Sequence, residues 1–301
     1  MLAVVALTLW LSQDLPDPNR LMQREVPLST KIYDRTGQTV LFELHGAQRR
    51  TLVTLDQIPE HLKWATIAAE DREFYRHRGF RIRSMVRAAV VNFLSRGRAQ
   101  GGSTLTQQFA KNAILSPEKT DTRKVKELLL AIQIERLFTK DQILQLYFNE
   151  IPYGGNAYGV QAATETYFGK GVKDLTVAEA AVLAAMTKRP TYYSPYGSHR
   201  DELIGRQRYI LDEMTRAGRL TPANAAAAKA EKLTFRPPTE DIIAPHFVFY
   251  VKELLAARYG ENFVESGGLT VVTTLDLEQQ HLAETAVAEG VERTAKLGAS
   301  N

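Results

Sequence analysis

Three polar segments interrupt apolar helical sequence between Ile67 and Glu135. Residues 70–79 carry carboxylates and a histidine; residues 101–112 open with two glycines and continue with hydroxyl, amide and lysine side chains; residues 123–127 hold cations and a glutamate. A carboxylate can accept a proton, glycines allow close backbone approach to a ligand, and fixed cations stabilise charge that develops on a leaving phosphate. Together these groups predict the transfer of a sugar from a phosphate.

Glu70 is the candidate general base. A helix is expected to begin near Pro59, which suits a first helical turn, and to run to Ala69. Ile67 and Phe74 would be helical neighbours of Glu70, and partial desolvation by them would raise the pKa of the carboxyl. An ordinary solvated glutamate on a charged helix fits the same pattern.

The second segment predicts a helix N-terminus at a glycine turn. Thr104 and Gln107 have the spacing of a capping box after Gly101-Gly102. Thr104, Gln107 and Lys111 share one helical face beside that N-terminus, where anions are favoured. Polar helices with a lysine are common, so the two glycines carry much of this interpretation.

The third segment opens an amphipathic helix expected over Arg123 to Phe138. Arg123, Lys124 and Glu127 share one face at spacings of three and four residues. The expected buried side consists of Val125, Leu128, Leu129 and Ile132. A surface salt-bridge helix, whose pairs contribute little to stability, is the alternative.

Charge is concentrated in this region. Residues 70–140 hold 15 Lys and Arg against 7 Asp and Glu, a local charge of +8, while the whole chain carries +4. Such a basic region suits phosphate, anionic lipid or nucleic acid, but no nucleic-acid recognition motif accompanies it. The chain has no cysteine, which excludes disulfides and thiolate chemistry, and its six histidines lack an HExxH spacing.

The N-terminus predicts a membrane anchor. Residues 1–12 are almost wholly apolar, although a complete span needs ~20 such residues. We expect a truncated transmembrane anchor rather than a signal peptide, with a buried strand as the alternative. The helix expected over Ile82 to Leu94 has an apolar stripe and a basic flank, which fits a membrane surface or a protein core equally well.

The remaining sequence predicts mainly helices with two small β segments. A hairpin is expected around Gly37, with a third strand over 50–55. Helices are expected over 141–149, 177–186, 202–217, from 221, and over 244–259, with a turn-rich loop at 152–159. A strand at 269–275 and a helix from Asp276 have no evident partners, which suggests that another domain opens there.

The order and spacing of these segments resemble the five motifs of the peptidoglycan glycosyltransferases, glycosyltransferase family 51. The resemblance covers about residues 28–215. It is carried by Glu70-Asp71-Arg-Glu-Phe74 with His77 and Gly79, Gly101-Gly-Ser-Thr-Leu-Thr-Gln-Gln108 with Lys111-Asn112, Arg123-Lys124-Val-Lys-Glu127, Ile143-Leu-Gln-Leu-Tyr147-Phe-Asn149 to Tyr167-Phe-Gly-Lys170, and Leu175 to Ala184 with Pro190.

Two later segments, Ala244 to Phe247 and Gly268 to Asp276, resemble the part of class A penicillin-binding proteins of the 1A-like group that leads into a transpeptidase domain. No such domain follows in this chain, so neither transpeptidase activity nor penicillin binding is expected of it. A Ser-x-x-Lys does occur at Ser116 to Lys119, but it lacks a Lys-Thr-Gly partner and is interpreted as accidental.

The resemblance implies a mainly α, lysozyme-like glycosyltransferase domain with a small N-terminal β hairpin and a C-terminal strand–helix fragment. The expected organisation is an anchor at 1–12, a linker at 13–27, the glycosyltransferase domain at 28–220, a helical extension at 221–265, and a linker or the start of a further domain at 266–301.

The resemblance also implies polymerisation of lipid II into β-1,4-linked glycan, with inversion at MurNAc C1 and release of undecaprenyl pyrophosphate. Glu70 is then the general base, and Glu127 orients the acceptor or the cations. Substrate-binding roles fall to Ser103, Thr104, Gln107, Gln108, Lys111, Asn112, Arg123 and Lys124.

The implied partners are lipid II, the growing glycan strand, membrane lipid and other cell wall synthesis proteins, with moenomycin as inhibitor and no nucleic acid. No organic cofactor is implied, and a divalent cation, Mg or Mn, is plausible on the pyrophosphate. The expected location is the outer face of the cytoplasmic membrane. A lysozyme-type glycan-cleaving enzyme and a non-catalytic membrane scaffold remain the alternatives.

Overall fold

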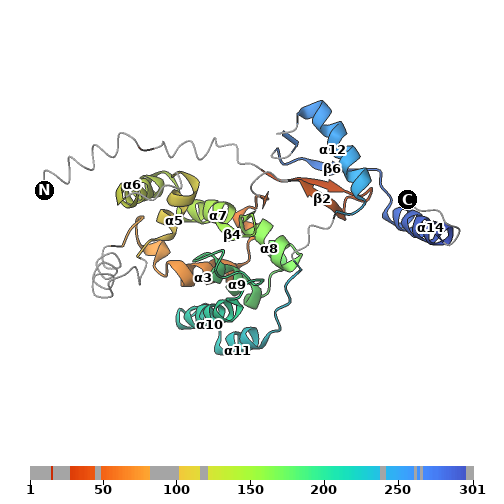
Figure 1. The fold of residues 1–301 in the computed structure, drawn as a ribbon. Helices are drawn as coiled ribbons and strands as arrows, with labels where there is room; N and C mark the ends of the chain where they lie inside the picture. Colours follow the sequence, from red (N-terminus) through yellow and green to blue (C-terminus); the bar gives the residue numbers. More distant parts are fainter. Residues whose placement is uncertain are drawn as a thin grey trace. The chain divides into compact units, whose positions relative to one another are not determined.

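The computed structural model describes residues 15, 28–44, 49–81, 102–115, 121–237, 242–260, 263–264 and 267–295. It divides into two compact units, one formed by residues 1–26 and 50–238 and the other by 27–49 and 239–301. Helices dominate both units (Figure 1), which confirms the mainly α fold class. The expected helix over Ile82 to Leu94 and the Ser116 to Lys119 segment lie outside the described residues, as do residues 1–12.

The first unit is built around α9 (Val177–Met186), and every residue of this helix after Val177 is buried. Apart from Glu179 its sequence is apolar on all sides, which is the pattern of a helix surrounded by others. Helices α3 (Glu60–Glu70) and α10 (Arg200–Arg216) pack against it, as Figure 1 shows. The C-terminal end of α3, where the candidate base lies, is therefore supported by the centre of this unit.

The other helices of the first unit follow the predicted order. They are α5 (Leu105–Ala113), α6 (Asp121–Leu137), α7 (Lys140–Glu150), α8 (Val160–Phe168) and α11 (Pro222–Ala230). Short 3-10 helices occur at η1 (Leu55–Gln57), η2 (Phe74–Arg76) and η3 (Val172–Asp174). Helix α5 packs on both α6 and α7, so the second and third polar segments are brought onto neighbouring helices.

Two details of the first unit differ from the sequence-based expectation. The turn-rich loop contains a small hairpin of β4 (Pro152–Gly154) and β5 (Ala157–Tyr158), made possible by positive φ angles at Gly154 and Gly155. The third strand was expected over 50–55, but β3 is only Arg49–Arg50 and belongs with β5 and β4 rather than with the N-terminal hairpin.

The second unit contains the predicted N-terminal hairpin, in which β1 (Thr30–Tyr33) pairs antiparallel with β2 (Val40–Leu44). The expectation that the last strand lacks a partner is wrong, because β6 (Thr270–Val272) pairs in parallel with β1. Helices α12 (Pro245–Tyr259) and α14 (Leu277–Ala295) complete this unit, whose small core includes Ile32, Leu41 and Val248.

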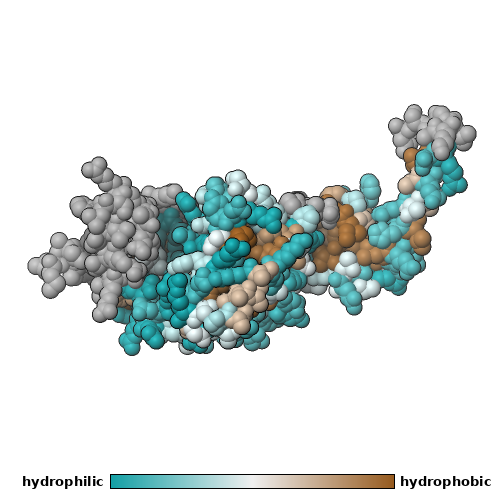
Figure 2. All heavy atoms as spheres, turned by 90° about the horizontal axis from the view of Figure 1, so that it is seen from below, coloured by the Kyte–Doolittle hydropathy of each residue, from teal (hydrophilic) through white to brown (hydrophobic). Residues whose placement is uncertain are grey.

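The surface of the described residues is largely polar on the face drawn in Figure 2, where hydrophobic residues gather in limited areas. Within the part of the chain that the structure describes, no helix combines the length and the apolar character that a membrane span requires.

Candidate active site

Glu70 is the last residue of α3, and its carboxylate is surrounded by polar donors. Arg206 of α10 donates from a terminal guanidinium nitrogen to Glu70 Oε1 at 3.0 Å, and Gln108 Nε2 of α5 donates to Oε2 at 2.7 Å. The Thr187 hydroxyl lies 3.3 Å from Oε1. The carboxylate, whose helical neighbours were expected to be partly apolar, thus also faces hydrogen-bond donors from three elements distant in sequence.

Gln108 connects Glu70 to α7. While its amide nitrogen donates to Glu70, its Oε1 accepts a hydrogen bond from the Tyr147 hydroxyl at 3.2 Å. The buried tyrosine thereby fixes which end of the amide faces the carboxylate. Burial, with the negative charge of Glu70 as the next cause, holds the pKa of Tyr147 well above its usual value, so this hydroxyl remains a donor at neutral pH.

Asp71, the next residue, is fully buried and fixes the start of α5. Its Oδ2 accepts hydrogen bonds from the Leu105 backbone N–H at 3.1 Å and from His77 Nε2 at 2.8 Å. The Gly79 N–H donates to His77 Nδ1 at 3.1 Å, which leaves the proton on Nε2 in the neutral ring. The negative charge of a carboxylate at a helix N-terminus stabilises the helix, because the first N–H groups there have no acceptor within the helix.

The capping box predicted at Thr104 is confirmed. The Thr104 hydroxyl accepts from the Gln107 N–H at 3.2 Å and donates to the Gly79 carbonyl at 2.8 Å, and Gln107 Oε1 accepts from the Thr104 N–H. Both side chains are buried. The shared face expected for Thr104, Gln107 and Lys111 is thus divided, with two residues used to hold α5 and Lys111 exposed.

Ser103 and the third polar segment form a second polar cluster. Lys124 Nζ lies 2.5 Å from Glu127 Oε2 and donates to Ser103 Oγ at 2.7 Å, and Arg123 Nε lies 3.5 Å from Glu127 Oε1. The Lys124 side chain is 61% exposed, whereas that of Glu127 is 7% exposed. The predicted shared face is confirmed, and it presents an accessible ammonium group held by a buried carboxylate.

The buried side predicted for α6 is wrong. Val125, Leu128, Leu129 and Ile132 are only partly buried, and the fully buried positions are Glu127, Leu130, Ala131 and Ile134. At about 100° per residue the two stripes lie on nearly opposite faces of the helix, and the buried one includes a charged residue because Glu127 is neutralised by its cationic neighbours. Hydropathy alone could not identify that face.

The two polar clusters, one around Glu70 and one around Glu127, meet neighbouring parts of the same segment. Ser103 lies two residues before the first residue of α5, and Gln108 lies within the helix. Asn112, one turn beyond Gln108, donates from Nδ2 to the Gln108 carbonyl at 2.9 Å. Lys111 is paired with no acid among the described residues. The Glu127 cluster therefore contacts the residue before the α5 cap, and the Glu70 cluster contacts α5 itself.

Sequence reasoning did not identify Arg206 or Thr187 as neighbours of the candidate base. Arg206 is one of several arginines on a polar helix, and nothing in its spacing marks it. Thr187 directly follows α9 and resembles an ordinary C-terminal hydroxyl. Tyr147 was named only as part of a family motif, without a role.

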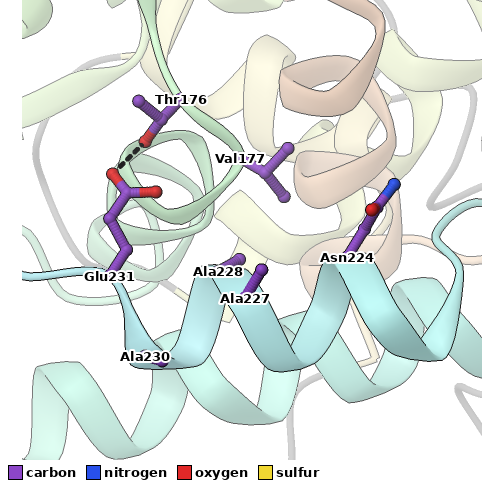
Figure 3. Close-up of a pocket in the computed structure, with 7 residues that line it drawn as sticks. All are labelled: Thr176, Val177, Asn224, Ala227, Ala228, Ala230 and Glu231. Carbon is purple, nitrogen blue, oxygen red and sulfur yellow. Dashed lines mark hydrogen bonds between the residues drawn. The ribbon is translucent and has the colours of Figure 1, made fainter.

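No group of three or more His, Asp or Glu side chains that could hold a metal ion occurs among the described residues. A hollow with a volume of about 550 Å³ lies elsewhere, against α11 and the start of α9. Figure 3 shows Thr176 donating across it to Glu231, at 2.6 Å. None of the predicted site residues lines this hollow.

Comparison with known proteins supports the resemblance. The family model described as Transglycosylase matches residues 37–215, more than half of the chain. The chain belongs to the transglycosylase family. The match covers both polar clusters and includes Arg206.

Curated relatives agree with the transglycosylase family. The chain is 41% identical over 285 residues to "Penicillin-binding protein 1A" of Aquifex aeolicus and 38% identical over 291 residues to the protein of that name from Escherichia coli. These matches cover 95% and 96% of the chain but only 39% and 34% of the relatives. A crystal structure of penicillin-binding protein 1A from Haemophilus influenzae matches 87% of the chain and 29% of its own, at 23% identity and a TM-score of 0.47.

Proposed function

We propose that the chain is a peptidoglycan glycosyltransferase that polymerises lipid II into β-1,4-linked glycan. The observation that carries the proposal is the meeting of two motifs of the transglycosylase family at one carboxylate, since Gln108 of the second motif donates to Glu70 of the first. The proposal covers the activity of this chain, which spans less than half of its curated relatives.

In the proposed reaction, Glu70 takes the proton of the 4-hydroxyl of the acceptor GlcNAc. The hydroxyl oxygen attacks C1 of the donor MurNAc on the face opposite the pyrophosphate, and the bond from C1 to the phosphate oxygen breaks. The pyrophosphate leaves with that electron pair, so configuration at C1 inverts from α to β. Undecaprenyl pyrophosphate is the released product.

Negative charge develops on the leaving pyrophosphate, and cations placed there can accelerate the reaction by ~100-fold or more. Lys111 and Lys124 are suited to this role because both are exposed, and Arg123 lies beside Lys124. Glu127 orients the two cations of its own cluster. Ser103, Gln108 and Asn112 are the proposed sugar and phosphate contacts, while Thr104 and Gln107 act by holding α5 in place.

A divalent cation, if the reaction uses one, would be held mainly by the pyrophosphate, because the described residues offer no carboxylate or imidazole cluster for it. No step is assigned to that ion. Moenomycin is proposed as an inhibitor that competes for the donor site, and membrane lipid and other cell wall synthesis proteins are proposed partners at the outer face of the cytoplasmic membrane.

The proposal is tested by incubating the chain with lipid II in detergent and determining the products by mass spectrometry. Glycan strands that lengthen with time, with release of undecaprenyl pyrophosphate, would support polymerisation. A parallel incubation with preformed glycan distinguishes polymerisation from the lysozyme-type alternative, which is glycan cleavage. Fragmentation of that glycan, with lipid II left unchanged, would overturn the proposal.

A further inference from the structure

Arg206 is joined to the candidate base across 136 residues of sequence, and the proposed function gives it no role. Its terminal guanidinium nitrogen donates to Glu70 Oε1 at 3.0 Å. The two side chains are 12% and 9% exposed. A pair so shielded from water is screened less by solvent than a surface salt bridge.

The guanidinium is held on two further sides. Its Nε–H donates to the Ala185 carbonyl near the end of α9 at 3.2 Å, and the group lies over the Tyr193 ring, 5.9 Å from the centroid. A planar guanidinium donates in fixed directions. These contacts therefore set the direction from which Arg206 approaches Glu70.

The two carboxylate oxygens of Glu70 are held unequally. Oε2 has the Gln108 amide as its donor, whereas Oε1 faces both Arg206 and the Thr187 hydroxyl. The Thr187 hydroxyl has one proton to donate, and its oxygen lies closer to the Ala184 carbonyl oxygen, at 2.9 Å, than to Glu70 Oε1, at 3.3 Å. Arg206 is thus the main anchor of Oε1, and Oε2, which has the Gln108 amide as its donor, can accept a further hydrogen bond.

We propose that Arg206 is a positioning residue for the general base: it fixes Oε1 of Glu70 so that Oε2 faces the acceptor hydroxyl. The inference rests on the proposed function and deepens it. Arg206 itself is assigned no contact with substrate.

Other charged groups near Glu70 limit how much one arginine can do. Lys188 follows Thr187, and its pKa is lowered by burial first and then by the positive charge of Arg206, while Glu70 raises it. Tyr147 of α7, Asp71 and Arg189 are further titratable or charged groups in this region. With Arg206 neutralised, Lys188 still places a positive charge near Glu70, so we expect the substitution to have a partial effect on pH dependence.

The test compares Arg206→Met, Arg206→Lys and a matched control, Arg208→Met, in steady-state polymerisation of lipid II across pH. Arg208 is an exposed arginine on the same helix. Because misplacing a general base forfeits part of its 10²–10⁴-fold contribution, we expect Arg206→Met to lower kcat by about 10- to 100-fold. KM should change by less than about twofold, since uniform substrate binding is retained.

The pH profile provides the readout that a purely structural role would not move. Because Arg206→Met removes a positive charge 3.0 Å from the carboxylate, the low-pH limb of kcat should move to higher pH in this variant. Arg206→Lys should recover part of the lost rate and should bring the low-pH limb part of the way back to its wild-type position. Arg208→Met should behave as the wild type. If Arg206→Met does not fold, Arg206→Gln, which can still donate to Ala185, provides the same readouts.

The proposal is overturned if the folded neutral variant keeps wild-type kcat and an unmoved low-pH limb, or becomes faster. Failure of the underlying function looks different. If wild-type protein does not polymerise lipid II, both proposals fail together; if it does, and Glu70→Gln abolishes activity while Arg206→Met does not reduce it, only the role of Arg206 is rejected.

Discussion

Glu70 and Asp71 are adjacent acids with different surroundings. Asp71 is buried, and its Oδ2 accepts hydrogen bonds from the Leu105 backbone N–H and from His77, so this oxygen holds the start of α5. Glu70 accepts hydrogen bonds from side chains, and among the described residues its Oε2 has the Gln108 amide as its donor. This difference supports the proposal that Glu70, rather than Asp71 of the same motif, acts as the base.

His61 makes stability depend on pH. Burial lowers the pKa of this α3 histidine from its ordinary 6.5, and the hydrogen bond to the Leu175 carbonyl, at 2.9 Å, offsets only part of that effect. Below pH 6.5 the unfolded chain therefore takes up a proton more readily than the folded one, and folding stability falls with falling pH. We expect His61→Gln to show a smaller loss of stability than the wild type between pH 7 and pH 5.

The measurement is the unfolding midpoint in urea at a series of pH values for both proteins. Equal slopes against pH for the variant and the wild type would show that His61 does not contribute to the acid sensitivity.

At the scale of elements, Gly79 is where the first motif meets α6. Its φ is +87°, in the region that favours glycine, and a Cβ at this position would lie 2.9 Å from the Ala131 carbonyl oxygen. Both the backbone conformation and the contact oppose a side chain. We expect Gly79→Ala to destabilise the first unit by about 2 kcal/mol or more.

Gly205→Ala is the matched control, because Gly205 lies within α10 and a Cβ there meets nothing within 4 Å. That change should be neutral or stabilise by up to about 1 kcal/mol. Chemical denaturation measures both. Equal effects of the two substitutions would contradict the close approach of Gly79 to α6.

Most elements were predictable from local sequence, because their signals are local. Capping boxes, formed by Thr104 with Gln107 and by Thr176 with Glu179, mark the starts of α5 and α9. The buried face of α6 was not predictable, because Glu127 is buried through its pairing with Arg123 and Lys124 rather than through hydropathy.

The candidate site was predictable only in part, for a related reason. The residues in recognisable motifs were found, and the structure joins Gln108 to Glu70 and Ser103 to Lys124. Arg206 was missed because its importance depends on a contact across 136 residues. The partner of β6 was missed likewise, since β1 lies near the other end of the chain.

At the scale of the whole molecule, the two units are composed differently from the expected domains. The N-terminal hairpin was assigned to the glycosyltransferase domain, but residues 27–49 pack with 239–301 and leave 50–238 as the other unit. Both polar clusters and the α9 core lie within that range. The residues proposed for catalysis therefore do not depend on the small sheet.

We accordingly expect residues 50–238 to fold alone. The isolated segment should show a helical circular dichroism spectrum and a cooperative thermal transition. A non-cooperative transition would contradict this division and would show that the first unit needs residues of the second.

The central claim is that the Glu70 carboxylate is the base in glycan polymerisation. The most direct measurement is the rate of lipid II polymerisation by Glu70→Gln beside Glu73→Gln, an exposed acid three residues away, with circular dichroism to verify folding. We predict that folded Glu70→Gln loses activity by at least about 100-fold and that Glu73→Gln keeps it. Unchanged glycan synthesis by folded Glu70→Gln would contradict the account.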